Sequence, residues 1–465
     1  MLNNARKAPS VVAELQALRQ RVHAAFTPRD IVVLGMGGST LAARVLSEVY
    51  TSELRHLGVR LRIIDTSEPH TVSAALDATD AADTLVLVSS KSGATVETKA
   101  LCCLWFAKLR ENLGSAETAA THFIALSDAD SPLQQLAHRE GWQAVITTPA
   151  DTGGRFSALT AFGLAPLVLA GIDPGDLLKS ALSMEDDCLA GLKVGGDPAS
   201  SLAAVIYERY RAGRDKLLLV PPAEVPTFGL WLEQLLAESL GKDGHGIIPL
   251  PCDPLRAHNL LVAGRDCQEF VLPSTLSAAG MGAELVRWIF ATQRLGQLMG
   301  VNPLTQPDVA AAKVNTEELL ARGAGEVTGS ELLGSGKNLS THELAELRGG
   351  NRPRLDLPPR TTHLVLLVWL PETREVIAGV DALTSQLERE LGVPVCVGYG
   401  PRYLHSTGQL HKGGPDTGAY LFLSETETDD FDLPLPERPY TLRQLYAAQM
   451  AGDQEVLRER DRALL

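Results

Sequence analysis

Hydroxyl groups and one lysine gather in the segment Ser89–Thr95, which reads SSKSGAT. The segment follows a short branched run at residues 84–88, typical of a strand buried on both faces, and precedes a helix-compatible stretch that reaches residue 109. The first backbone N–H groups of a helix are unpaired and lie at the positive end of its dipole, so a turn of this kind can bind an anion. The same residues could also cap an ordinary strand-to-helix turn.

A second turn of the same type lies at residues 35–39 (GMGGS), after a buried-type strand at 30–34 and before a helix at 40–50. Glycines allow a tight turn and a close approach of a ligand to the backbone, and Ser39 adds a hydroxyl. Thr40 stands where a dinucleotide-binding fingerprint needs its third glycine, and the Gly-Lys-Ser/Thr ending of a P-loop is missing. The pattern therefore favours a small phosphate ester over a nucleotide.

Three charged residues elsewhere have types that could act on such a ligand. Arg155 lies in a glycine-opened turn (GGRFS, 153–157) and can present its fork to an oxyanion. Glu238 lies in the last turn of a helix at 227–240, where the helix dipole opposes a carboxylate, and Lys313 lies on a helix at 308–320. Each of the three could instead be an ordinary solvated surface residue.

The elements that position these residues alternate between strand and helix. Strands at 31–34, 59–64, 84–88, 122–125 and 142–147, with helices between them and an amphipathic helix at 9–26 in front, predict an α/β fold with a doubly wound parallel sheet. Ligands of such sheets bind beyond the carboxyl ends of the strands, where both turns fall. Strands at 217–220, 246–250 and 270–272 predict a second α/β unit, followed by a long apolar helix at 276–300.

The remaining chain predicts a C-terminal extension. Residues 323–360 are rich in Gly, Pro and charge, which indicates a linker with a short helix at 341–347. A β-α-β-β unit follows at 363–370, 375–391, 393–397 and 419–423, with a glycine-rich loop at 403–414 and a closing helix from 442. We expect domains at 1–190, 191–330 and 331–465.

Composition limits the function classes. The 465 residues carry a net charge of −14, which argues against nucleic-acid binding. Six scattered cysteines have neither metal-ligand nor disulfide spacing, and neither a signal peptide nor a membrane-spanning run is found. We expect a cytoplasmic protein that contacts no membrane, and the absence of a His/carboxylate cluster predicts no metal.

Five motifs together resemble those of the phosphoglucose isomerase family, and they occur in that family's order. They are GMGGS (35–39), SSKSGATVET (89–98), GGRFS (153–157), ESLGK (238–242) and NPLTQPDVAAAK (302–313). The closing HSTGQLHKGG (405–414) and the C-terminal helix resemble the isomerase half of bifunctional transaldolase/phosphoglucose isomerase proteins. This second likeness implies that the chain is either one half of such a fusion or a stand-alone relative.

The resemblance implies two sugar-isomerase (SIS) domains with an active site between them, usually completed by a second subunit, so a homodimer is possible. It implies isomerisation of glucose 6-phosphate and fructose 6-phosphate without a cofactor. Glu238 would be the base, Arg155 would stabilise the enediolate, and Lys313 would assist at the ring oxygen. Gln306 would contact the sugar. The residues that would bind the substrate phosphate are Ser39, Ser90, Lys91, Ser92 and Thr95.

The chain departs from the family pattern at two places. Ala310 stands four residues after Gln306, where the family usually has a glutamate. The segment that carries the family's ring-opening histidine is missing between Glu238 and Lys313. His405 or His411 could fold back over the site as a replacement, His411 being favoured because Gln-Leu-His resembles the missing segment, or both could be incidental histidines of a polar loop.

Two other functions fit parts of the pattern. A non-catalytic regulator that binds phosphosugars would keep the Ser/Thr turn but would have no use for the three charged residues together. A sugar isomerase of the amidotransferase type would need a nucleophilic cysteine near its N-terminus, whereas the first cysteine is Cys102.

Overall fold

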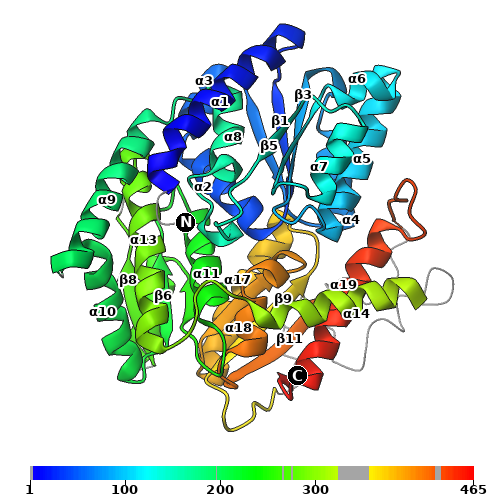
Figure 1. Cartoon of the computed structure of the whole chain (residues 1–465). Helices are drawn as coiled ribbons and strands as arrows, with labels where there is room; N and C mark the ends of the chain where they lie inside the picture. The colour runs from blue at the N-terminus through cyan, green and yellow to red at the C-terminus, as the bar shows by residue number, and fades with distance from the viewer. Residues whose placement is uncertain (1–3, 195, 264–265, 274–275, 323–354, 425–430) are drawn as a thin grey trace.

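A computed structural model describes residues 4–194, 196–263, 266–273, 276–322, 355–424 and 431–465. Three parallel β-sheets follow one another along the chain, each flanked by helices, so the predicted α/β class is confirmed (Figure 1). No helix of these ranges combines the length and the apolar character needed to cross a membrane.

The first sheet has five parallel strands in the order β2-β1-β3-β4-β5. Their bounds are Asp30–Gly35 (β1), Arg60–Ile64 (β2), Thr84–Ser89 (β3), Phe123–Ser127 (β4) and Ala144–Thr147 (β5). The central strands β1 and β3 are buried along their full length. Because β1 pairs with β3, the two predicted ligand turns leave neighbouring strands at the same edge.

Alternate residues of these strands face two different cores. Ile31 and Val33 belong to a core shared with α1 (Asn4–Ala25), α2 (Leu41–Val49), α3 (Thr51–Leu57) and α8 (Ala161–Ala170). Val32 and Leu34 face the opposite core, which is built with α4 (Pro69–Asp77), α5 (Val96–Leu113), α6 (Ala116–Ala120) and α7 (Pro132–Arg139). The alternation is what a strand of period two requires when helices cover both faces.

The second sheet has the order β7-β6-β8. It comprises β6 (Lys216–Val220), β7 (Ile248–Pro251) and β8 (Cys267–Val271), with helices α9 (Gly175–Val194), α10 (Pro198–Arg211), α11 (Thr227–Leu240), α12 (Pro254–Val262) and α13 (Ala278–Met299). One continuous hydrophobic core includes residues of the first sheet and of β6. The predicted boundary at residue 190 falls inside α9, which packs along α13 (Figure 1).

The C-terminal unit has a third parallel sheet, in the order β10-β9-β11-β12. It comprises β9 (His363–Trp369), α17 (Arg374–Leu391), β10 (Val395–Tyr399), β11 (Gly418–Ser424), α19 (Leu442–Glu459) and the short β12 (Ala463–Leu464). Helix α14 (Ala310–Arg322) lies against α19, and Leu442 and Leu445 of α19 complete a core of the first sheet. The linker and short helix predicted from residue 323 fall largely outside the described residues.

The predicted loop at 403–414 is wrong. This segment forms a 3₁₀ turn, η5 (Arg402–His405), and a short helix, α18 (Gly408–Gly413). All six residues of α18 are buried because the helix packs against α11 and against η4 (Pro307–Val309). The Gly and Gln content of the segment is typical of a loop and led to that prediction. Tertiary packing stabilises a helix there instead.

Candidate active site

The two turns at the ends of β1 and β3 contact each other. Ser89 Oγ donates a hydrogen bond of 2.7 Å to the carbonyl of Ser39, which lies in the 3₁₀ turn η1 (Gly37–Ser39). In the next turn, Ser90 Oγ donates to Thr95 Oγ1 at 3.1 Å, and Thr95 is the residue that precedes α5. The first turn therefore contacts the end of β3, and the hydroxyl groups of Ser90 and Thr95 lie beside the N-terminus of α5, where an anion would be stabilised.

Lys91 and Ser92 lie on the same turn but face different partners. The Lys91 ammonium forms an ion pair with Asp128, just beyond β4. Ser92 is exposed, and its Oγ accepts a hydrogen bond of 3.2 Å from the backbone N–H of Ala94. Lys91 thus contributes positive charge that Asp128 partly neutralises in this structure.

A close backbone approach brings Arg155 to the first turn. Arg155 lies in the 3₁₀ turn η3 (Gly154–Phe156). A Cβ atom on Gly38 would lie 2.3 Å from the carbonyl carbon of Gly154, closer than any side chain allows. The glycine of GMGGS that precedes Ser39 is therefore required by the contact between η1 and η3.

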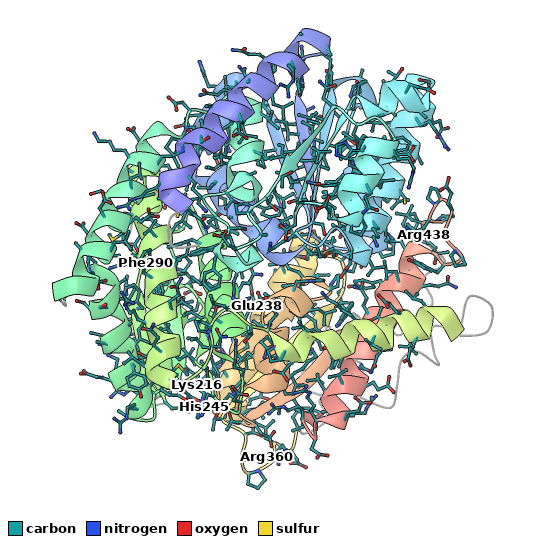
Figure 2. All side chains as sticks on the ribbon, viewed as in Figure 1. Lys216, Glu238, His245, Phe290, Arg360 and Arg438 are labelled. Atoms are coloured by element: carbon teal, nitrogen blue, oxygen red, sulfur yellow. The ribbon has the colours of Figure 1, made fainter. Side chains whose placement is uncertain are left out.

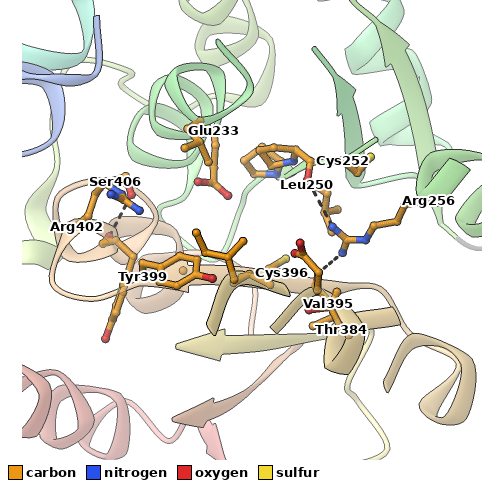
Figure 3. A pocket seen from close by; sticks show the side chains of 18 of the residues that line it. Glu233, Leu250, Cys252, Arg256, Thr384, Val395, Cys396, Tyr399, Arg402 and Ser406 are labelled. Carbon is orange, nitrogen blue, oxygen red and sulfur yellow. Dashed lines mark hydrogen bonds between the residues drawn. The ribbon is translucent and has the colours of Figure 1, made fainter. Parts of the chain in front are cut away.

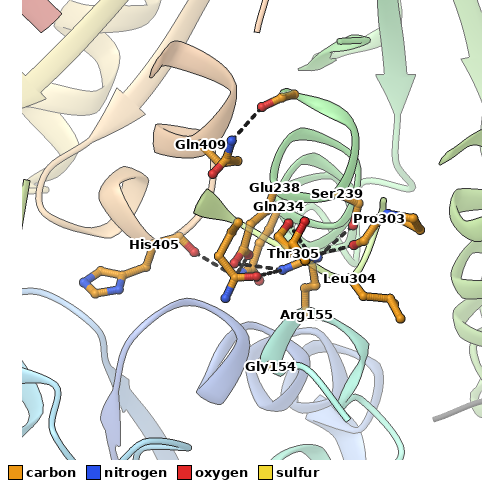
Figure 4. A network of polar contacts seen from close by, with 12 residues as sticks. Gly154, Arg155, Gln234, Glu238, Ser239, Pro303, Leu304, Thr305, His405 and Gln409 are labelled. Carbon is orange, nitrogen blue, oxygen red and sulfur yellow. Dashed lines mark hydrogen bonds and ion pairs between the residues drawn. The ribbon is translucent and has the colours of Figure 1, made fainter. Parts of the chain in front are cut away.

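Arg155 is buried and forms an ion pair with Glu238 at 2.9 Å between Nη1 and Oε1 (Figure 4). Its Nε donates to Ser239 Oγ at 2.7 Å, and its Nη2 donates to the carbonyl of Pro303 at 2.6 Å. Burial lowers the pKa of Arg155 from its ordinary value, while the Glu238 carboxylate opposes that shift. These bonds hold both charged groups in one orientation near the centre of the molecule, where Figure 2 shows Glu238.

Gln306 and Lys242 attach the 302–306 loop to the same cluster. Gln306 Oε1 accepts a hydrogen bond of 3.0 Å from Arg155 Nη1. The buried Lys242 ammonium donates to the carbonyl of Asn302 at 2.7 Å and also to that of Thr305. Burial, followed by repulsion from Arg155, lowers the pKa of Lys242 to about 8.

His405 reaches the site from η5 of the C-terminal unit. Its Nε2 lies 2.7 Å from Oε1 of Glu97, a buried carboxylate in the first turn of α5. Burial alone would raise the pKa of Glu97, but attraction to His405 and the hydrogen bonds that Glu97 accepts lower it below its ordinary value. The amide of Gln234 donates to the backbone carbonyl of His405 at 2.8 Å and to Glu238 Oε2 at 3.2 Å, which links the two ends of the site (Figure 4).

A cavity of about 150 Å³ connects the phosphate turn with His405. Ser92 and Thr95 are among the residues that line it, together with Glu97, Lys313 and His405. Lys313 projects from α14 and is exposed. The structure therefore brings Lys313, two of the five predicted phosphate-binding residues and a histidine to one cavity.

His411 lies in a different environment. It is buried in α18 between the rings of Tyr403 and Tyr420, with ring centroids 5.8 and 5.4 Å away. Burial and the neighbouring Lys412 ammonium, which pairs with Asp453, hold the pKa of His411 well below its ordinary value. His411 is not among the residues that line the cavity at His405.

Four residues of this region were assigned no role from the sequence: Glu97, Gln234, Lys242 and Gln449. Glu97 lies in the motif SSKSGATVET, and its place in a helical first turn was a signal for a stabilised carboxylate. Gln449 donates a hydrogen bond to Glu97 from 352 residues away, so no local pattern could reveal it. Among the residues that the structure describes, no three His, Cys, Asp or Glu side chains are grouped to hold a metal ion.

Comparison with known proteins agrees with this geometry. The family model described as phosphoglucose isomerase matches residues 7–245, which is more than half of the chain. The chain therefore belongs to the phosphoglucose isomerase family.

Two curated relatives give the extent of the similarity. A probable glucose-6-phosphate isomerase of Haloarcula marismortui is 34% identical over 237 residues, which cover 50% of this chain and 52% of that protein. A glucose-6-phosphate isomerase of Staphylococcus saprophyticus is 35% identical over 224 residues, covering 47% and 50% respectively. The chain thus spans about half the length of the curated relatives it matches.

Solved structures extend the likeness beyond these segments. A hypothetical protein of Thermus thermophilus matches with a TM-score of 0.58 and 25% identity over 69% of this chain and 90% of its own. A glucose-6-phosphate isomerase of Chlamydia trachomatis matches with a TM-score of 0.57 and 18% identity over 74% and 76%. The latter likeness is one of fold.

Proposed function

We propose that this protein interconverts glucose 6-phosphate and fructose 6-phosphate through a cis-enediolate. The observation that carries the proposal is the Glu238–Arg155 pair, held at 2.9 Å beside Gln306 and linked through Gln234 to His405. Membership of the phosphoglucose isomerase family and the relatives named glucose-6-phosphate isomerase support it.

The substrate phosphate would bind at the turns that follow β1 and β3. Ser39, Ser90, Ser92 and Thr95 offer hydroxyl groups there, and the N-terminus of α5 and Lys91 supply positive potential. Hydrogen bonds to a charged group each contribute about 1.5–3 kcal/mol, which is enough to anchor one end of the substrate. The sugar would then extend from these turns toward Glu238 and Arg155, with Lys313 and His405 of the neighbouring cavity at its ring.

Proton transfer needs one base that can take and return a proton. Glu238 would remove the C1 proton of open-chain fructose 6-phosphate and return it at C2, so a single carboxylate is sufficient. Negative charge develops on the enediolate oxygen meanwhile. Arg155 would stabilise that charge, because a buried guanidinium is fixed and keeps its proton.

Ring opening precedes this step, because hexose phosphates are mainly cyclic. The geometry favours His405 over His411 as the group that exchanges a proton at the anomeric hydroxyl. His405 borders the cavity and is oriented by Glu97, whereas His411 is enclosed by two tyrosines. Lys313, on the other wall of the cavity, would contact the ring oxygen.

A coupled assay of glucose 6-phosphate formation from fructose 6-phosphate tests the proposal. The native chain should turn over, and Glu238→Gln should bind the substrate but lose at least about 100-fold in kcat, because the amide keeps the shape and removes the basicity. The exposed Glu224→Gln, in the loop before α11, is the matched control and should retain full activity.

Two results would contradict the proposal. Near-normal turnover by Glu238→Gln would mean that another carboxylate is the catalytic base. Tight binding of fructose 6-phosphate by the native chain without turnover would favour a phosphosugar-binding regulator instead.

A further inference from the structure

A second cavity is lined in part by the two elements that carry Glu238 and His405, α11 and η5. Its volume is about 410 Å³, within the range of roughly 300–1,000 Å³ that is usual for small-molecule sites. Residues of α11, β7 and α12 form one wall, and residues of α17, β10 and η5 form the other (Figure 3). Within the described chain, the cavity therefore separates the second sheet from the C-terminal sheet.

Glu233 projects from α11 into this cavity, with its carboxyl directed toward β10 (Figure 3). The residue is only 9% exposed. No hydrogen bond or ion pair to this carboxyl is found among the described residues. A buried carboxyl without a partner is costly, so its persistence at the wall of a cavity indicates a ligand that would pair with it.

The arginines at the cavity are already neutralised. Arg402 pairs with Glu372 at 2.9 Å and with Asp65 at 3.2 Å. Arg256 pairs with Glu388 at 2.7 Å, and Arg44 pairs with Asp65 at 2.6 Å. No cation of this lining is left without a carboxylate, so an anionic ligand would find no free counter-ion here.

The lining also contains carboxyl groups that have no ion-pair partner in the described chain. Asp381 of α17 has no ion pair in the described chain, and Asp253 bonds only to backbone N–H groups at the start of α12. Leu230, Val397 and Tyr399 add apolar surface between these acids. We propose that the cavity binds a small organic cation, an ammonium or guanidinium group on an apolar body, with Glu233 as its counter-ion.

Proton release should accompany this binding. Burial raises the pKa of Glu233 to about 8, with Arg402 opposing the shift, so the empty site holds a protonated carboxyl at pH 7. A cation binds the ionised form, hence its affinity rises with pH and levels off above about 8. Other charged or titratable groups facing the cavity are Arg44, Cys252, Asp253, Arg256, Glu372, Asp381, Cys396, Tyr399, Arg402 and Tyr403.

Four of these neighbours have pKa values shifted away from this window. Burial raises the pKa of both Cys252 and Cys396 to about 12, and it raises the pKa of Tyr399 further above its ordinary value. Arg402 has a pKa raised by its two carboxylate partners against the effect of burial. Burial also raises the pKa of Asp381, against the attraction of Arg256. We expect the ionisation of Glu233, which is aimed into the cavity, to control binding between pH 6 and about 8.

Calorimetric titration of the full chain with n-butylammonium tests the proposal, with n-butanol as the neutral probe of similar shape. We expect butylammonium to bind, with an affinity that rises about tenfold from pH 6 to pH 7 and then levels off near pH 8. At pH 7, titrations in two buffers of different ionisation enthalpy should report close to one proton released per ligand. Butanol should bind at least about tenfold more weakly than butylammonium at pH 8.

Glu233→Gln should weaken butylammonium about tenfold or more and abolish the pH dependence, whereas the exposed Glu224→Gln should change neither. Equal binding of both probes, a pH-independent affinity, or no binding of butylammonium to the native chain would overturn the proposal. Because the readout is heat of binding, this outcome is independent of whether the protein isomerises a sugar phosphate.

Discussion

His405 and Glu97 meet at 2.7 Å although they belong to the C-terminal unit and to the first sheet unit. The carboxylate is buried and also accepts a hydrogen bond from Gln449. Because the carboxylate is fixed, it holds the imidazole of His405 in one orientation through Nε2. A histidine oriented in this way is suited to exchanging a proton with a ligand. His411 lacks such a partner, since its Nδ1 has no hydrogen bond in the described chain and its ring packs between tyrosines.

The two histidines therefore give opposite predictions. His405→Ala should slow the turnover of cyclic fructose 6-phosphate by about 100-fold, the usual size of one acid–base contribution, but should slow an open-chain analogue much less. His411→Ala should lower the melting temperature, because it leaves a cavity in α18, and should affect both substrates equally. Steady-state kinetics on the two substrates and a thermal melt separate these effects. Equal losses on both substrates for His405→Ala would mean that the residue only shapes the site.

Site residues that belong to a local motif were predictable from the sequence, whereas residues positioned by tertiary packing were not. Arg155 and Glu238 were singled out from local motifs, and the structure places them in contact. The preference for His411 rested on the order Gln-Leu-His, which carries no information about which side of a short helix faces the cleft. The partner of Glu97 lies 308 residues further along the chain, so no spacing rule could have chosen between the histidines.

Helix α11 serves two sites from opposite faces. Glu238 and Gln234 contact the candidate active site, while Glu233 faces the second cavity. The turn η5 also borders both sites, since His405 lines one cavity and Arg402 lines the other. A displacement of either element would therefore alter both sites together.

The contact between η1 and η3 gives a prediction at the scale of elements. Gly38→Ala should lower the free energy of unfolding by about 2 kcal/mol and reduce kcat, because its Cβ would lie 2.3 Å from the Gly154 backbone and would push Arg155 away. Denaturant unfolding and the coupled assay would measure the two effects.

The neighbouring Gly153→Ala is the control. Gly153 has a φ of −65°, which alanine adopts, and the nearest atom to its added Cβ is in the Phe156 ring at 3.5 Å. This variant should unfold and turn over like the native chain. If Gly38→Ala unfolded and turned over substrate like Gly153→Ala, the close approach of η1 to η3 would not be needed for stability or activity.

Elements with a clear period were predictable, and those held by tertiary contacts were not. The helix predicted at 227–240 is α11 with the same bounds, because a long apolar segment between polar turns leaves little choice. Residues 403–414 look like a loop, yet Gln409 fixes them by donating to the Gly241 carbonyl at 2.9 Å and accepting from the Asp308 N–H at 2.9 Å. Those two partners lie on other elements and are invisible to any local window.

At the scale of the whole molecule, three units of the chain each contribute residues to the candidate site. Glu97 comes from the first sheet unit, Glu238 from the second, and His405 from the C-terminal unit. We expect the specific activity to stay constant when the protein is diluted from micromolar to nanomolar concentration. An assay over that range, with sedimentation analysis at each end, would check this, and a loss of specific activity on dilution would mean that a second copy completes the site.

The bond from Gln449 to Glu97 also has a consequence for the time course of synthesis. Glu97 leaves the ribosome 352 residues before Gln449, an interval of roughly 20–70 s at about 5–20 residues per second. For the first 308 residues of that interval the carboxylate lacks both of its later partners, and the core beneath α5 lacks Leu442 and Leu445 until α19 emerges. A growing chain can thus close the sheet around β1 and β3 early, but the Glu97 carboxylate gains its two protein partners only after η5 and α19 have emerged and docked.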